Sequence, residues 1–216
     1  MRYLKFLLIF ILAISLLGCS GTEAVDCKEV ALTELGNRYS GSFSNVSESK
    51  EARMTGLDGT KFVYTVVNNN TNKQFEVYVS TDGTYLGDTY PKSVFDNDII
   101  NTVKNILVKY TGVADVNYEY NYLVCDSVYT SYLEYISDTN NDSYLSLNAN
   151  IAENSFDSAA SIIYSILEEL GMYGFKYNAK FIISGGTEVS FNNMDGAEIT
   201  SQYVIDKISK AVDAKG

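Results

Sequence analysis

The chain contains no histidine, no tryptophan, one proline and three cysteines in 216 residues. Without histidine, neither a Ser-His-Asp triad nor a Cys-His pair can form, and no zinc site can use an imidazole ligand. Three cysteines are also too few for a Cys₄ metal site. We therefore identify no catalytic residue, and we expect the chain to fold without a metal or an organic cofactor.

Basic residues are scarce as well, since 16 Lys and Arg stand against 27 Asp and Glu, a formal net charge of −11. Nucleic-acid phosphates require a basic protein face, so this balance argues against a nucleic-acid partner. It also argues against flat adsorption on anionic lipid. The hydrophobic fraction of 46% nevertheless predicts a packed core rather than a disordered chain.

The first residues have the pattern of a secretory leader. Arg2 and Lys5 precede an uncharged apolar run from Phe6 to Leu17. That run is too short for a membrane-spanning helix, which needs about 20 apolar residues. A short basic start followed by such a run is typical of a signal peptide.

The leader ends in Leu16-Leu17-Gly18-Cys19, which resembles the lipobox of bacterial lipoproteins. The resemblance implies a signal peptide at residues 1–18, removed before Cys19, and a diacylglyceryl group on that cysteine. Residues 19–25 would then be a lipidated tether on the outer face of the cell membrane. Two acyl chains anchor a protein stably. The alternatives are an ordinary cleaved signal peptide and an uncleaved membrane tether. Leu16, however, is large at a position where ordinary cleavage sites need a small residue.

The two remaining cysteines, Cys27 and Cys125, leave two possibilities open. Outside the cytoplasm they could form a disulfide. They could equally lie apart, one near the tether and one in a strand.

Residues 26–112 predict a unit built from a helix, a meander and a helix. Asp26 and Glu29 have the spacing of a capping box, which opens a helix. Between residues 43 and 88 the apolar residues alternate, with Asp-Gly turn signals, as in an antiparallel meander of three or four strands. Helical spacing returns between residues 93 and 110.

Residues 113–216 predict a second unit with a mixed sheet, and a seam near Thr111 to Ala114. The whole chain is therefore expected to be α+β. The order is β-α-β-α-β-β-α: a strand at 116–124, a helix at 127–137, a strand at 144–151, a helix from Asn154 or Ser155 to Gly171, a hairpin at 177–192 and a helix from Thr200.

This layout of short amphipathic helices and hairpins resembles the small uncharacterised lipoproteins of low-GC Gram-positive bacteria. The resemblance is one of layout, and no motif after Cys19 identifies a characterised family.

Three acidic segments are candidate sites, and we interpret one of them, Asp195 to Glu198, as a turn. The run Asp138 to Asp142 has oxygen ligands spaced as in an EF-hand, but Ser143 and Ala149 stand where that loop needs Gly and Glu. We interpret it as a polar turn. Glu168 and Glu169 close a helix and are expected to be solvated.

The most unusual pattern is Tyr118, Tyr120 and Tyr122, alternating with Asn and Glu. A period of two places the three rings on one face of a strand. If they are exposed, the rings form a binding surface, because tyrosine combines apolar area with a hydroxyl group. If they are buried, they belong to the core beneath a helix.

The sequence thus favours a non-enzymatic extracytoplasmic lipoprotein that binds a protein, a peptide or a cell-wall component, or serves as an accessory subunit. The alternative is a cell-wall-acting enzyme that uses carboxylates only, which would need two acidic residues in one pocket.

Overall fold

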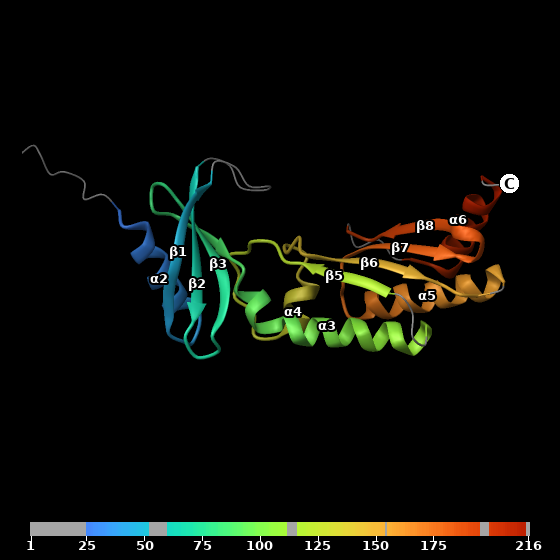
Figure 1. Ribbon diagram of the computed structural model, residues 1–216, viewed down its shortest axis with the longest axis horizontal. Helices are drawn as coiled ribbons and strands as arrows, with labels where there is room; N and C mark the ends of the chain where they lie inside the picture. Colours follow the sequence, from blue (N-terminus) through green and yellow to red (C-terminus); the bar gives the residue numbers. More distant parts are fainter. Residues whose placement is uncertain (1–24, 52–59, 112–115, 154, 195–198, 215–216) are drawn as a thin grey trace, which may run out of the picture.

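The computed structural model describes residues 25–51, 60–111, 116–153, 155–194 and 199–214. The leader, Cys19 and the turn signal at Asp58-Gly59 lie outside these ranges, as do residues 112–115 and Asp195 to Glu198. Over the described residues the protein is α+β, with one antiparallel and one mixed four-stranded sheet, which confirms the expected fold class (Figure 1).

The first unit packs helix α2 (Cys27–Arg38) on an antiparallel sheet. The Asp26 carboxylate accepts hydrogen bonds from the backbone N–H groups of Lys28 (3.0 Å) and Glu29 (3.2 Å), as the sequence predicted. The sheet runs in chain order through β1 (Phe43–Glu51), β2 (Lys61–Asn68), β3 (Lys73–Ser80) and β4 (Tyr85–Asp88). Its core comprises Cys27, Ala31, Leu35, Tyr39, Tyr64, Val66, Phe75, Val77 and Val79.

Helix α3 (Tyr90–Thr111) leaves the first unit and runs along the second (Figure 1). It starts three residues before the predicted helix because Asp88 Oδ1 accepts a hydrogen bond from the Tyr90 N–H at 2.7 Å. The proline at position 91 is tolerated there, since the first turn needs no donor. The sequence groups this helix with the first unit, with a seam near Thr111 to Ala114. Its apolar side instead lies in the second core, through Phe95, Ile99, Val103, Ile106 and Leu107.

The second sheet runs in the order β5 (Val116–Asn121), β6 (Tyr144–Asn150), β7 (Tyr177–Ile183) and β8 (Thr187–Asn192). The β6–β7 pair is parallel, whereas the two outer pairs are antiparallel. The parallel pair is connected through α5 (Phe156–Met172), as parallel strands require.

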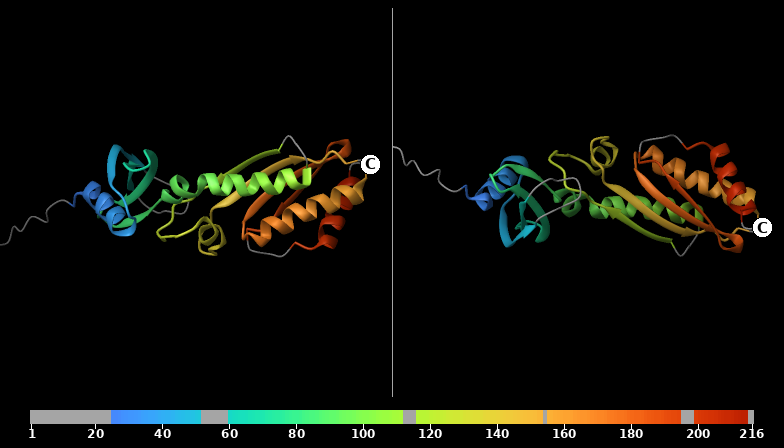
Figure 2. Two further views of the ribbon diagram at one scale, coloured as in Figure 1. Left: turned by 90° about the horizontal axis from the view of Figure 1, so that it is seen from below. Right: turned by 90° about the horizontal axis from the view of Figure 1, so that it is seen from above.

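Helices cover one face of this sheet. Figure 2 shows α3 and α5 on one side and the strands exposed on the other. Helix α6 (Ser201–Asp213) packs against α5 and β8 and contributes Val204 and Ile208 to the core. Among the described residues no helix lies over the opposite face of the sheet, so that face is open to solvent.

Three local details complete the second unit. Helix α4 (Tyr132–Ser137) is shorter than predicted, because Ser131 caps it and accepts a hydrogen bond from the Glu134 N–H. Helix α5 passes through Gly171, and the positive φ comes later, at Gly174 (87°). The predicted hairpin between β7 and β8 is confirmed, with a short turn η1 (Ser184–Gly186).

Candidate functional site

The tyrosine row lies on the helix-covered side of β5, beside the second core. Tyr120 is 7% exposed and belongs to that core, while Tyr118 and Tyr122 are half-buried and pack at its edge. The rings of Tyr120 and Tyr122 meet edge to face, with centroids 4.9 Å apart. Burial raises the pKa of Tyr120. The structure therefore brings the row together, largely as packing.

A groove of about 510 Å³ opens where the two units meet, and it includes part of this row. From the first unit it is lined by Thr65 and Glu76, cross-strand partners on the face of the sheet turned away from α2. From the second unit it is lined by Asn121, Tyr122 and Tyr144, among others. Its volume lies in the range of small-molecule sites, about 300–1,000 Å³.

The groove offers apolar surface and hydrogen-bonding groups together. Leu123 in its wall is 42% exposed. The Asn121 amide donates to Ser146 Oγ (2.9 Å) and to the Tyr144 carbonyl (3.3 Å), so its orientation is fixed. The Tyr122 hydroxyl donates to Asp96 Oδ1 at 3.0 Å, which anchors the ring. Fixed rings and amides favour binding, because less side-chain entropy is lost when a ligand arrives.

Three charged side chains line the groove: Glu76, Lys92 and Glu119. The Lys92 ammonium lies 6.0 Å from the centre of the Tyr122 ring. Glu76 accepts a hydrogen bond from the Tyr78 hydroxyl. The two carboxylates come from different units, and both residues are exposed.

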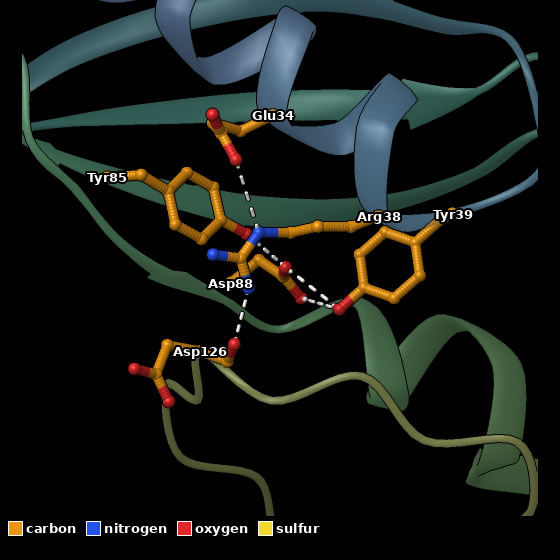
Figure 3. A network of polar contacts seen from close by, with 6 residues as sticks. All are labelled: Glu34, Arg38, Tyr39, Tyr85, Asp88 and Asp126. Carbon is orange, nitrogen blue, oxygen red and sulfur yellow. Dashed lines mark hydrogen bonds and ion pairs between the residues drawn. The ribbon is translucent and has the colours of Figure 1, made fainter.

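The joint between the two units is built around Asp88, whose side chain is fully buried (Figure 3). Its carboxylate accepts hydrogen bonds from the hydroxyls of Tyr39 (3.1 Å to Oδ2) and Tyr85, besides the Tyr90 N–H. Its backbone also pairs with Cys125, through N–H to carbonyl bonds of 2.9 and 3.1 Å. Asp88 thus ties the last strand of the first unit to the segment that follows β5.

The electrostatics of this joint follow from its burial. Loss of solvent raises the pKa of Asp88, and the hydrogen bonds from Tyr85, Tyr90 and Tyr39 offset part of that rise. Burial and the nearby carboxylate also raise the pKa of Tyr39 and of Tyr85. Both phenols therefore stay protonated and continue to donate.

Arg38, at the end of α2, adds a second tie across the joint. Its Nη1 donates to the carbonyl oxygen of Asp126, and its Nε lies 3.5 Å from the Glu34 carboxylate. The guanidinium carbon sits 4.2 Å from the centre of the Tyr85 ring, a cation–π arrangement visible in Figure 3. These contacts hold the walls of the groove in position.

The possible disulfide is not formed, since Cys27 and Cys125 are both free thiols. Cys27 is the first residue of α2, and its Sγ atom lies 3.5 Å from the Ser80 carbonyl oxygen. Cys125 pairs with Asp88, which Tyr39 contacts at the other end of α2. That helix is roughly 18 Å long, whereas a bridge needs Cα atoms within about 7 Å. Burial raises the pKa of the Cys125 thiol to about 12, so it is a poor nucleophile.

In the other acidic segments, carboxylate oxygens already accept hydrogen bonds, and Glu169 is tied to α3 rather than solvated as expected. Asp138 accepts hydrogen bonds from the Tyr129 hydroxyl (2.7 Å) and the Asn140 N–H (2.8 Å), which lower its pKa. Glu169 accepts from the Lys109 ammonium and the Tyr110 hydroxyl, both at 2.6 Å. In the described ranges no three His, Cys, Asp or Glu side chains are grouped to hold a metal ion.

Sequence reasoning did not find the groove or the role of Asp88. The groove depends on how the two units meet, and periodicity within a segment carries no information on that. One local signal was present for Asp88: it precedes Tyr90-Pro91 at the start of a helix, where a carboxylate can accept from the first N–H groups.

Comparisons with family models, with curated proteins and with solved structures gave no match to this chain. In the part of the chain that the structure describes, no helix has both the length and the apolar character needed to cross a bilayer. The candidate site therefore rests on its geometry.

Proposed function

We propose that the protein is an extracytoplasmic lipoprotein, anchored in the cell membrane through Cys19, that binds a ligand in the groove between its two units. The support for the anchor is the leader that ends in Leu16-Leu17-Gly18-Cys19. Residues 20–25 can extend at most about 21 Å. The groove would then stand near the outer membrane surface, within reach of a protein, a peptide or a cell-wall component.

The observation that carries the binding role is the lining of the groove. Tyr122 and Tyr144 present rings with one polar end, and Asn121 presents an amide already fixed in place. Aromatic rings beside oriented polar groups are common in recognition sites.

The alternative is a cell-wall-acting enzyme that uses carboxylates only. One observation favours it, because Glu76 and Glu119 line the same groove. A glycosidase, however, needs a general acid whose pKa is raised by a water-poor setting. Both of these residues are exposed, so binding is the better supported function.

Metabolic labelling with a fatty acid tests the anchor. The wild-type chain should incorporate the label, and Cys19→Ser should abolish incorporation and leave unprocessed precursor. Equal labelling of the two proteins would contradict the lipid anchor.

Photo-crosslinking in intact cells tests the groove. A photoreactive residue at position 123, in the groove wall, should form an adduct with the ligand. A residue at position 108 is the matched control, because Val108 is also an exposed apolar side chain (51%) but lies about 16 residues along α3 from Lys92, roughly 24 Å away. Equal adducts from both positions, or none from either, would contradict a ligand site in the groove.

A further inference from the structure

Asparagine and serine make up eight of the 13 side chains on the open face of the second sheet. The face is formed by every second residue of the four strands, while the residues between them pack into the core. Figure 2 shows this face in its right-hand view. Its members are Asn117, Glu119, Asn121, Tyr144, Ser146, Asn148, Asn150, Asn178, Lys180, Ile182, Glu188, Ser190 and Asn192.

The strand register places amide side chains side by side on this face. Asn117 lies opposite Asn148, and both are exposed. Asn178 lies opposite Asn192, and the two amides hydrogen-bond to each other. A side-chain amide both donates and accepts, so each pair offers donors and acceptors close together.

The face is also nearly free of net charge, although the chain as a whole carries −11. Its charged members are Glu119, Lys180 and Glu188. Lys180 and Glu188 form an ion pair at 2.8 Å, which leaves Glu119 as the remaining charge. The acidity of the protein is therefore located elsewhere.

The open face is continuous with the groove. A shallow hollow of about 180 Å³ lies over β5 and β6, and its lining includes Asn117, Glu119 and Asn148. Glu119 also lines the groove. Together they form a polar trough along β5, a strand of six residues and thus about 20 Å long.

We propose that this trough binds an extended, uncharged glycan strand of the cell wall, with its end in the groove. This inference rests on the proposed function and names its ligand class. Sugar hydroxyl and acetamido groups donate and accept as side-chain amides do, and the rings of Tyr122 and Tyr144 can cover the apolar faces of sugars.

The same observations disfavour other polymers. An anionic polymer meets Glu119 on the face and an acidic protein around it. An extended peptide binds by pairing with a free strand edge or by filling apolar pockets. The trough lies over the face of β5 and β6 rather than along the free edge of β5, and the small side chains that line it are polar.

Co-sedimentation tests the glycan assignment. The full chain, extracted from membranes in mild detergent, is mixed with insoluble peptidoglycan stripped of protein and of anionic polymers. The wild type should sediment with the glycan to the same extent at low and high salt, since screening weakens only charge-driven binding. Loss of sedimentation at high salt, or no sedimentation at all, would overturn the proposal.

Paired variants locate the binding on the open face. Asn117→Ala with Asn148→Ala should weaken binding about tenfold, because two hydrogen-bonding amides are lost. Asn101→Ala with Asn105→Ala is the matched control, with two exposed asparagines on α3 at the helical side. It should bind as the wild type does. All variants should keep the wild-type melting temperature, and Asn148→Ala alone replaces the pair if they do not. Equal binding by both pairs would overturn the proposal.

The adduct from position 123 separates failure of this inference from failure of the proposed function. An adduct that a muramidase shortens and a protease leaves intact supports the glycan. An adduct that proves to be a protein overturns the glycan and leaves the binding role standing. If no adduct forms, the proposed function itself fails.

Discussion

The two units differ in how many apolar side chains they bury. In the first, the single helix α2 covers a sheet whose buried apolar cluster has nine members, whereas the second cluster has 27 among the described residues. Stability scales with buried apolar area, so most of it resides in the second unit. The first unit contributes one wall of the groove, and the joint at Asp88 holds that wall in place. Each prediction below tests one side of this contrast.

The largest effect is expected in the second core. Tyr120→Ala should lower the free energy of unfolding by about 3–5 kcal/mol, because it removes a large buried ring. Urea unfolding measures this loss of stability. Tyr203→Ala is the control, since that side chain is 43% exposed and its loss should cost under about 1 kcal/mol. Similar values for the two variants would show that the row is not part of the core.

The second-largest loss of stability is expected at the joint. Asp88→Ala leaves the hydroxyls of Tyr39 and Tyr85 and the N–H of Tyr90 without their acceptor, at an expected cost of about 3 kcal/mol. The same change should weaken ligand capture from position 123, since the wall of the groove is no longer held. Unfolding by urea and crosslinking yield are the two measurements. A stable variant with normal capture would show that the second unit alone makes the site.

A glycine at the joint should give a smaller loss. Gly87 has φ of +136°, and a Cβ there would lie 2.6 Å from the Cys125 carbonyl oxygen. Gly87→Ala should therefore cost about 2 kcal/mol. Gly171→Ala, in α5 with open space around it, should instead stabilise by about 0.5–1 kcal/mol. Thermal unfolding should give a lower melting temperature than the wild type for Gly87→Ala and a higher one for Gly171→Ala. A neutral Gly87→Ala would mean that the units are not held close at this point.

The pH dependence of stability should report the charge on Asp88. Its pKa is raised in the folded state above the ordinary value of 3.8, so the folded state binds its proton more tightly than the unfolded state does. The contribution of Asp88 to stability therefore falls as pH rises from 3.8 through the raised pKa. Asp88→Asn should remove this slope, so the melting-temperature difference between variant and wild type should grow with pH across that window. A constant difference would contradict the raised pKa.

The smallest effect concerns the turn after α4. The Asp138 oxygens already accept hydrogen bonds from Tyr129 and Asn140. We therefore expect the same melting temperature in calcium as in chelator. A saturable shift of several degrees with calcium would reveal a binding site there.

Local chemistry made much of the fold predictable. The cap at Asp26, the helix start at Thr200 and the hairpin at 177–192 are signals carried by neighbouring residues, and each appears where expected. The alternation that predicted the strands also predicted which residues lie on the same face.

What the sequence did not predict depends on partners distant in the chain. The apolar side of α3 shows that Phe95 and Ile99 are buried, but not against which sheet. The segment before α4 resembles a helix, yet Cys125 pairs with Asp88 and holds the chain in an irregular course. The groove has the same origin, since Glu76 and Tyr144 are brought near by the joint.

The pairing of Asp88 with Cys125 also determines how one unit can turn against the other. The chain crosses from the first unit to the second just after Tyr90, whose ring still packs against the first core. A single crossing of this kind would leave the units free to rotate about the backbone. The return of the chain to Asp88 at Cys125, and to Arg38 at Asp126, adds two further attachments between the units. With these attachments the joint acts as a hinge, and the two units can bend toward or away from each other. Relative motion of the two units should therefore open or close the groove rather than rotate one unit about the other.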